Sequence, residues 1–146
     1  MKVIDVIDKC EELLEVDSTR EDLLECYNVI ESELAVDYLP LYATHQCDSP
    51  IVYYSEFAFN PLRIVGCNCK FKLYPEYISA EESIKSIQYA YSPNRKELYD
   101  ECSYRDDALD CLVYGTVAEF LISQGFFEES IWWNKKYKKQ IESLML

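Results

Sequence analysis

The apolar positions at the start of the chain repeat with the period of an α-helix. Within residues 3–15, the side chains Val3, Ile7, Cys10 and Leu14 are spaced by three or four residues. Acidic side chains lie among them, at Asp5, Asp8, Glu11, Glu12 and Glu15. This pattern predicts a short amphipathic helix with one apolar face.

A second helix is predicted over residues 18–38. Ser18 begins a Ser-Thr-Arg-Glu sequence, in which the serine hydroxyl can accept from the amide of Glu21 while the glutamate reaches back. Pro40 disfavours helical backbone at the residue before it, so the helix should end before Leu39. We expect the two helices to be antiparallel and joined by a short turn at Val16–Asp17.

The periodicity changes to that of β-strands between residues 51 and 91. Short runs rich in β-branched and aromatic residues recur there, and Cys69, Phe71 and Leu73 alternate with more polar neighbours. This part of the chain predicts a small antiparallel sheet with one face in water. Residues 92–104 have no period and contain Pro93, so we expect an irregular crossing segment.

Two further helices are predicted at the C-terminal end, over residues 106–124 and 127–144. The first is apolar over more than half its circumference, which predicts a central buried helix, and Gly125 should cap its C-terminus in a left-handed conformation. The predicted fold class is therefore α+β, a bundle of about four helices, two N-terminal and two C-terminal, with the sheet inserted between them. A length of 146 residues favours a single domain, 1–146.

The net charge of the chain limits the kinds of partner that it is expected to bind. The net charge is −13, and residues 1–50 contain thirteen acidic and three basic side chains. No basic stripe precedes the last helix, so specific DNA binding is not expected, although a like-charged wall would let a duplex slide past. No apolar run is long enough to span a membrane, and the acidic start does not resemble a secretory leader, so we expect synthesis in a cytoplasm.

The candidate chemistry rests on one histidine and several thiols. His45, Cys47, Cys67 and Cys69 are residue types that bind zinc, but both pairs are separated by a single residue. Two residues spaced in this way on a strand stand nearly 7 Å apart, whereas zinc pairs use a tighter turn. Reduced thiols are therefore the preferred interpretation over a metal site, and we expect neither a cofactor nor enzymatic activity.

Aromatic residues point to protein contacts. They make up 14% of the chain, and Trp132 and Trp133 cannot both lie at the centre of one apolar stripe, because successive helix positions point about 100° apart. One of them should lie at the edge of the core or outside it. A tryptophan across a core margin and a tryptophan in a protein interface are both compatible with this position.

The second half of the chain resembles small head-to-tail adaptor proteins of tailed phages. The resemblance is carried by three stretches, namely Phe71-Lys-Leu-Tyr-Pro75, Tyr89-Ala-Tyr91-Ser-Pro, and the run from Asp107 through Leu112-Val-Tyr-Gly115, Ala118-Glu119 and Gly125 to Trp132-Trp133 and Lys136-Tyr137. Residues 25–57 resemble such proteins more loosely. The resemblance implies a structural virion protein in the neck, made in the host cytoplasm.

Several partners are implied by the resemblance. They are the portal protein, other copies of the chain in a dodecameric ring, and tail or stopper proteins, while packaged DNA crosses the lumen without specific binding. Candidate interface residues lie on the last helix: Trp132, Trp133, Lys135, Tyr137, Lys138 and Lys139. Gly115 and Ala118 share one side of the preceding helix, where another helix can approach closely.

Two other classes of function remain open at this point. An acidic inhibitor that mimics a nucleic-acid backbone would use the carboxylates of residues 1–50, but it gives no role to the aromatic sheet and last helix. A metal-dependent hydrolase would use His45 with carboxylates and would contain bound metal.

Overall fold

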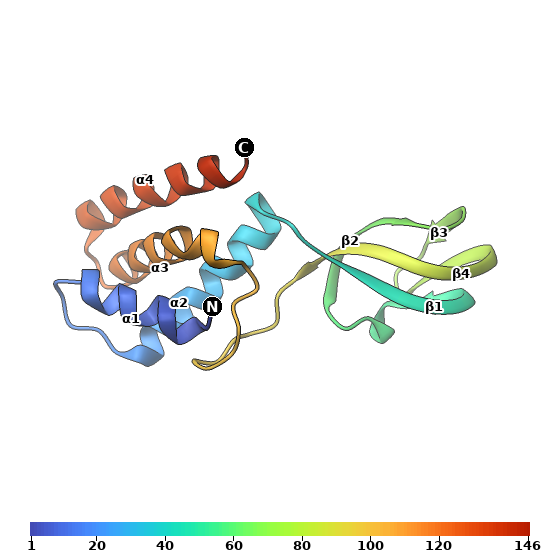
Figure 1. Cartoon of the computed structure of the whole chain (residues 1–146), viewed down its shortest axis with the longest axis horizontal. Coiled ribbons are helices and arrows are strands. Elements are labelled where there is room, and N and C mark those ends of the chain that lie inside the picture. Colours follow the sequence, from blue (N-terminus) through green and yellow to red (C-terminus); the bar gives the residue numbers. More distant parts are fainter. The chain divides into compact units, whose positions relative to one another are not determined.

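The computed structural model describes all residues, 1–146. It contains four α-helices and a four-stranded antiparallel sheet, which confirms the predicted α+β class (Figure 1). Residues 1–39 and 95–146 form a helical unit, and residues 40–94 form a sheet unit. Each unit has its own hydrophobic core. The single domain expected for residues 1–146 thus consists of two compact parts.

The helices agree with the predicted ranges apart from their ends. They are α1 (Val3–Leu13), α2 (Arg20–Glu33), α3 (Leu109–Ser123) and α4 (Phe127–Leu144). A π-helical segment, Leu34–Tyr38, extends α2, and a 3₁₀ turn, Asp106–Ala108, precedes α3. Gly125 has a φ of 86° after α3, as expected of a left-handed helix cap.

The N-cap of α2 differs from the prediction by one residue. Thr19, rather than Ser18, accepts a hydrogen bond from the amide of Asp22, at 3.2 Å. Both hydroxyl residues are good caps, so the local sequence does not choose between them. The connection from α1 is correspondingly longer than the expected turn at Val16–Asp17 and spans residues 14–19.

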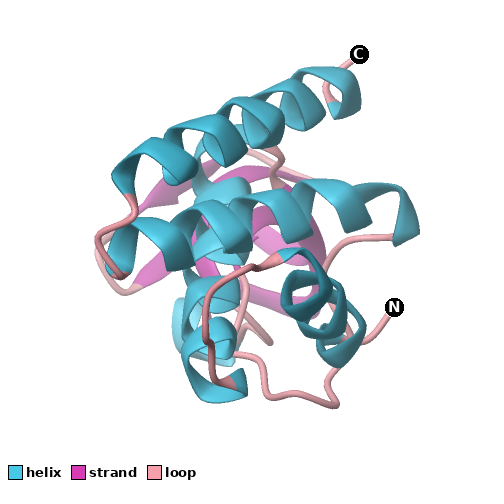
Figure 2. Cartoon of the chain, turned by 90° about the vertical axis from the view of Figure 1, so that its left-hand side faces the viewer, coloured by secondary structure: helices cyan, strands magenta, loops and turns pink.

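Helix α3 is the centre of the helical unit. It packs against α1, α2 and α4 (Figure 2). Most of its side chains are buried, as the sequence predicts. Among them the hydroxyl of Thr116 is fully buried and has no hydrogen-bond partner. A buried polar atom without a partner costs free energy of folding.

The crossing segment completes the start of α1. The amides of Val3 and Ile4 donate to the carbonyls of Asp100 and Leu98, at 2.9 and 2.8 Å. The amide of Cys102 donates to the carbonyl of Met1 at 2.9 Å. Because the first amides of a helix have no partner within it, the irregular segment supplies acceptors that α1 lacks.

One buried carboxylate holds the crossing segment against α2. Glu31 is 1% exposed, and it accepts hydrogen bonds from the Tyr27 hydroxyl and from both the amide and the hydroxyl of Ser103, each of the latter at 3.1 Å. The ammonium of Lys96 lies 3.4 Å from the same carboxylate. Asn28 adds hydrogen bonds to the backbone of Lys96. A non-periodic segment is thereby fixed by polar contacts.

The sheet unit is built on one long central strand. The strands are β1 (Leu41–Tyr53), β2 (Asn60–Cys67), β3 (Phe71–Leu73) and β4 (Tyr77–Ser92). β4 pairs with β1 along one side and with β2 and β3 along the other. The core lies on one face, where Phe57 stacks on Tyr89 and Phe59 stacks on Tyr91, with ring centroids 4.5 and 4.1 Å apart.

The sheet begins ten residues earlier than the predicted start at residue 51. Residues 41–50 already alternate between half-buried and exposed positions in β1. The alternation is hard to see in the sequence because His45, Cys47 and Ser49 occupy inner positions that strongly apolar residues usually fill.

Replacing Glu31 should destabilise the chain strongly. We expect Glu31→Ala to lower the free energy of unfolding by about 3 kcal/mol, because it removes the carboxylate that faces the mostly buried Lys96 ammonium and leaves the Ser103 donors without an acceptor. Urea unfolding would measure this loss. Glu25, an exposed residue of α2 paired with Arg95, provides the matched control, since Glu25→Ala removes a solvent-screened ion pair and should lower the stability much less. Equal losses would contradict the role given to Glu31.

Replacing Thr116 should have the opposite sign. Thr116→Val keeps the shape of the side chain and removes the unpaired hydroxyl, so we expect the free energy of unfolding to rise by about 1 kcal/mol. The same urea titration measures it. Thr19→Ala is the control, since loss of the α2 cap should lower the stability by about 1 kcal/mol. A destabilised Thr116→Val variant would show that the hydroxyl has a favourable role.

Candidate partner interface

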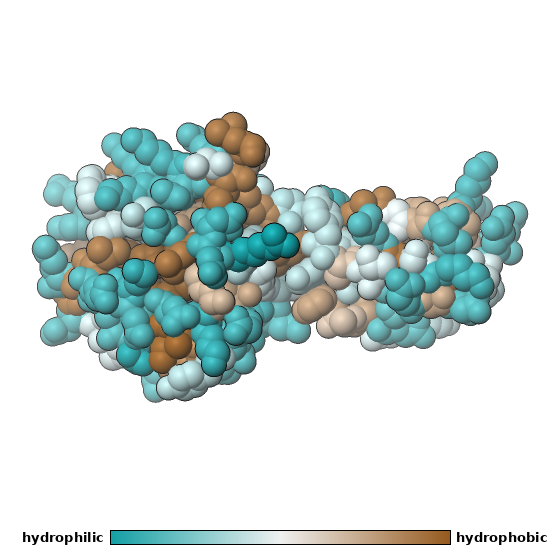
Figure 3. Space-filling view, viewed as in Figure 1, coloured by the Kyte–Doolittle hydropathy of each residue, from teal (hydrophilic) through white to brown (hydrophobic).

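Large apolar side chains remain exposed along α4 and the end of α3. Phe127, Ile131 and Trp132 of α4 are 63%, 59% and 53% exposed, and Ile122 of α3 is 49% exposed. These four residues are called here the α4 apolar surface. Apolar groups interrupt the polar covering of the helical unit in Figure 3, including a group at the C-terminal end of α4. Protein interfaces are enriched in such side chains.

A groove of about 340 Å³ adjoins this surface and is formed by α2, α3 and α4. Ile122 and Ile131 line it, and Gly115 and Ala118 belong to its α3 side. A Cβ atom on Gly115 would lie 2.8 Å from Cγ2 of Ile30 and from Cε1 of Tyr137. The helices that approach Gly115 closely are therefore α2 and α4 of the same chain. The groove lies next to this contact.

Three charged residues line the groove, and two of them have no partner. Glu33 accepts from the Tyr137 hydroxyl at 3.3 Å and lies 3.8 Å from the ammonium of Lys138. Glu119 and Lys135 also line the groove, but neither forms a hydrogen bond or an ion pair. Partial burial, with a further contribution from Glu33, raises the pKa of the Glu119 carboxyl. The groove therefore offers a free carboxylate and a free ammonium beside apolar side chains.

The two tryptophans form one aromatic cluster with Tyr114. Trp132 and Trp133 meet edge to face at 4.8 Å, and Trp133 lies 5.6 Å from Tyr114. Trp133 is half-buried against the helical core, while Trp132 is exposed, so one of the pair lies outside the core as the sequence predicts. The ammonium of Lys136 lies 4.3 Å from the centre of the Trp132 ring and within 5.4 Å of the other two.

Lys136 is not one of the interface candidates predicted from the sequence. Its position four residues after Trp132 and three after Trp133 places it next to both rings on one helix. That spacing is a signal that sequence reasoning can use. A cation above several aromatic rings fixes their orientation and contributes about 0.5–1 kcal/mol at an exposed site.

The remaining interface candidates on α4 have different environments. Tyr137 is 1% exposed and belongs to the core, so its ring is not available to a partner; its contact with the side of Gly115 explains the burial. Lys138 donates to the Tyr38 hydroxyl and covers that ring, which ties α4 to the π-helical segment. Lys135 and Lys139 are exposed. Only these two of the predicted lysines are free for an external contact.

The histidine and thiols of the sheet unit do not form a metal centre. The His45 ring packs against Phe57, with centroids 4.8 Å apart. The thiols of Cys47 and Cys67 donate to the carbonyls of Ile84 and Cys69, at 3.1 and 3.0 Å. No group of three or more histidine, cysteine, aspartate or glutamate side chains is arranged to hold a metal ion.

None of the perturbed thiols is activated as a nucleophile. Burial raises the pKa of Cys26 to about 11 and that of Cys111 to about 12, and it also raises the pKa of Cys69 in the sheet unit. A reactive cysteine requires a lowered pKa, because the thiolate is the nucleophile. The raised pKa values favour the protonated thiol over the thiolate.

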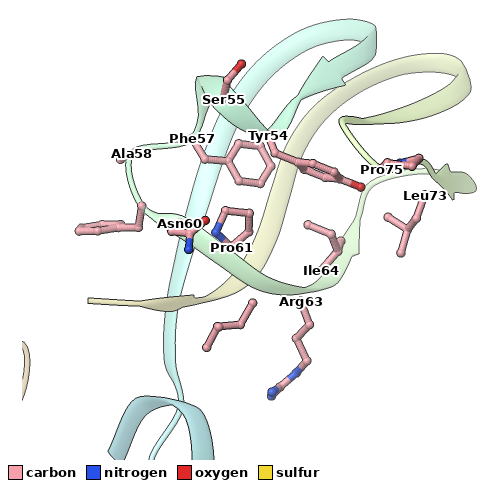
Figure 4. Close-up of a pocket in the computed structure, with 12 residues that line it drawn as sticks. Tyr54, Ser55, Phe57, Ala58, Asn60, Pro61, Arg63, Ile64, Leu73 and Pro75 are labelled. Atoms are coloured by element: carbon pink, nitrogen blue, oxygen red, sulfur yellow. The ribbon is translucent and has the colours of Figure 1, made fainter. Parts of the chain in front are cut away.

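A larger hollow of about 660 Å³ lies in the sheet unit, beside β2 and the connection from β1 (Figure 4). Tyr54, Phe57 and Pro61 line it, and Arg63 is its one charged residue. The Arg63 guanidinium donates to the Tyr42 hydroxyl at 3.3 Å. No acidic, histidine or cysteine side chain lines the hollow.

Part of the N-terminal acidity is neutralised within the helical unit. Arg20 bridges Asp8 and Glu11, at 2.8 and 3.0 Å, and Arg95 pairs with Glu25. Three acids of the N-terminal helices are thus paired with arginines.

No family model matches the chain, and no curated protein matches it either. None of the helices combines the length and the apolar character needed to cross a bilayer.

The free carboxylate in the groove yields a prediction for the isolated chain. Because the pKa of Glu119 is raised in the folded state, folding favours the protonated form of this side chain. The resulting stabilisation is fully present below the unfolded pKa of about 4.3 and is lost as the pH rises through the folded pKa. We therefore expect Glu119→Gln to raise the urea midpoint at pH 7. The gain should disappear in acid, where both side chains are neutral.

Glu128→Gln provides the control, because Glu128 is an exposed acid in the first turn of α4, where a negative charge is favourable. Its replacement should lower the midpoint slightly. A Glu119→Gln midpoint that is unchanged at pH 7, or raised equally at low pH, would contradict the electrostatic environment described for the groove.

Proposed function

We propose that the chain is a non-enzymatic structural protein of a tailed-phage particle, a head-to-tail adaptor that forms a ring under the portal and joins the capsid to the tail. Packaged DNA would pass through the lumen of this ring. The proposal rests on the resemblance carried by residues 71–137 together with the character of the exposed surface.

The observation that carries the proposal is the α4 apolar surface with the adjoining groove. Three large apolar side chains of one helix are each more than half exposed, although the helical unit already has a closed core. Such groups are stabilised when a partner covers them. A stable interface needs more than about 1,000 Å² of buried area, and the exposed apolar side chains of α4 beside a groove are suited to contribute to it.

Charge supports an orientation for the proposed adaptor. Lys135 and Lys139 are exposed on α4 without ion pairs, and they would face acidic groups of the portal. The N-terminal helices carry most of the net charge of −13 and would line the lumen. Like charge prevents a moving duplex from adhering to the wall, so this orientation separates the gripping surface from the DNA path.

The proposal is tested by mixing the purified chain with the portal ring from the same genome and measuring the complexes by native mass spectrometry and particle imaging. We expect a ring complex with many copies of the chain per portal. Ile131→Glu should abolish it, because the substitution puts a charge on a residue of the α4 apolar surface that also lines the groove.

Leu13→Glu is the matched control, since Leu13 is 40% exposed at the end of α1, a different helix of the same unit. This variant should still bind the portal. Failure of the unmodified chain to bind any portal or neck component would contradict the proposal. Equal binding by Ile131→Glu would show that the α4 apolar surface is not the contact.

A further inference from the structure

The outer edge of β1 is an open hydrogen-bonding surface. β1 pairs only with β4 and is the terminal strand of the sheet. No other segment forms a backbone hydrogen bond to residues 41–46. Every second residue of this stretch therefore directs its amide and carbonyl groups away from the sheet, in a geometry that can pair with another strand.

The opposite edge of the sheet is protected in ways that β1 is not. β2 contains Pro61, which has no amide hydrogen, and its register with β4 shifts on both sides of Arg63–Ile64. β3 is only three residues long. In β1 the register is unbroken from Leu41 to Gln46, and this stretch contains no proline, glycine or charged side chain. Prolines, register shifts and charged side chains usually prevent strand addition, and this stretch of β1 has none of them.

The same stretch is the neutral part of a strongly acidic chain. No aspartate, glutamate, lysine or arginine occurs between Asp37 and Asp48, while the net charge of the chain is −13. Two copies of this chain repel each other over most of their surface. The β1 edge is a place where their backbones can meet without opposing like charges, which favours a second copy as the occupant.

The sequence of β1 is also compatible with pairing to itself. In an antiparallel pair with its two-fold axis at Thr44, the two Thr44 residues lie opposite each other and Tyr42 lies opposite Gln46. On the other face, Ala43 lies opposite His45. Thr–Thr pairs and aromatic neighbours favour strand pairing, and the two Asp48 residues lie at opposite ends of the paired segment.

We infer that two copies of the chain associate in solution by antiparallel pairing of their β1 strands, centred on Thr44, into one continuous sheet. The pairing uses one edge twice, whereas a ring uses two different surfaces. The β1 pairing is therefore inferred for the free chain, and it does not depend on the proposed adaptor function.

Thr44→Lys tests the inference, because Thr44 is exposed and a lysine there stays in solvent in the single chain. In the pair, two lysines would lie directly opposite each other. Light scattering after size-exclusion chromatography, over a dilution series, should show dimers of the unmodified chain. The variant should dissociate at concentrations about tenfold higher or more.

Two further measurements separate pairing from misfolding. Val65→Lys puts the same charge on the protected β2 edge, where Val65 is 48% exposed, and should leave the dimer unchanged. Thr44→Glu alone should also weaken the dimer, and mixing it with Thr44→Lys should restore association through opposite charges.

A chain that is monomeric at every concentration would overturn the inference. A dimer insensitive to Thr44→Lys, or one disrupted equally by Val65→Lys, would overturn it as well. Absence of a mixed dimer from the two charged variants would overturn the register centred on Thr44.

Discussion

The helical unit depends on the burial of one carboxylate. Glu31 satisfies donors from the crossing segment, from its own helix and from Lys96, although the segment around Ser103 has no periodic structure of its own. With the segment held there, its carbonyls reach the first amides of α1. The start of α1, the crossing segment and α2 thus form one hydrogen-bonded assembly. A charge at this depth is stable only because every partner is present.

The packing of each core determines which side chains and strand edges of that unit stay exposed. In the helical unit, Tyr137 and Ile30 fill the space beside Gly115, so the apolar groups left on α4 are those that point away from the core. In the sheet unit, the aromatic stacks use one face of β4, and the neighbouring strands leave one smooth and one interrupted edge. Each exposed surface follows from how the corresponding core closes.

The sequence predicts the regular part of this structure well. Periods of 3.6 and 2 residues located four helices and the sheet, because burial of a stripe or a face constrains residue type. It predicts polar connections less well, because the sequence around Glu31 does not distinguish this carboxylate from those on a helix surface. The early start of β1 is also missed, because its inner positions are occupied by weakly apolar residues. Of the interface candidates, Trp132 is exposed as expected, whereas Tyr137 is buried, since the contact with Gly115 is long-range and local spacing does not reveal it.

The close contact at Gly115 links three positions that are far apart along the chain. Any side chain at 115 would meet both the methyl group of Ile30 and the ring of Tyr137. In diverging sequences of this fold, alanine at 115 should therefore occur only together with a smaller residue at position 30 or 137. The three positions should co-vary, and that correlation would mark the fold in chains too different to be aligned by overall identity.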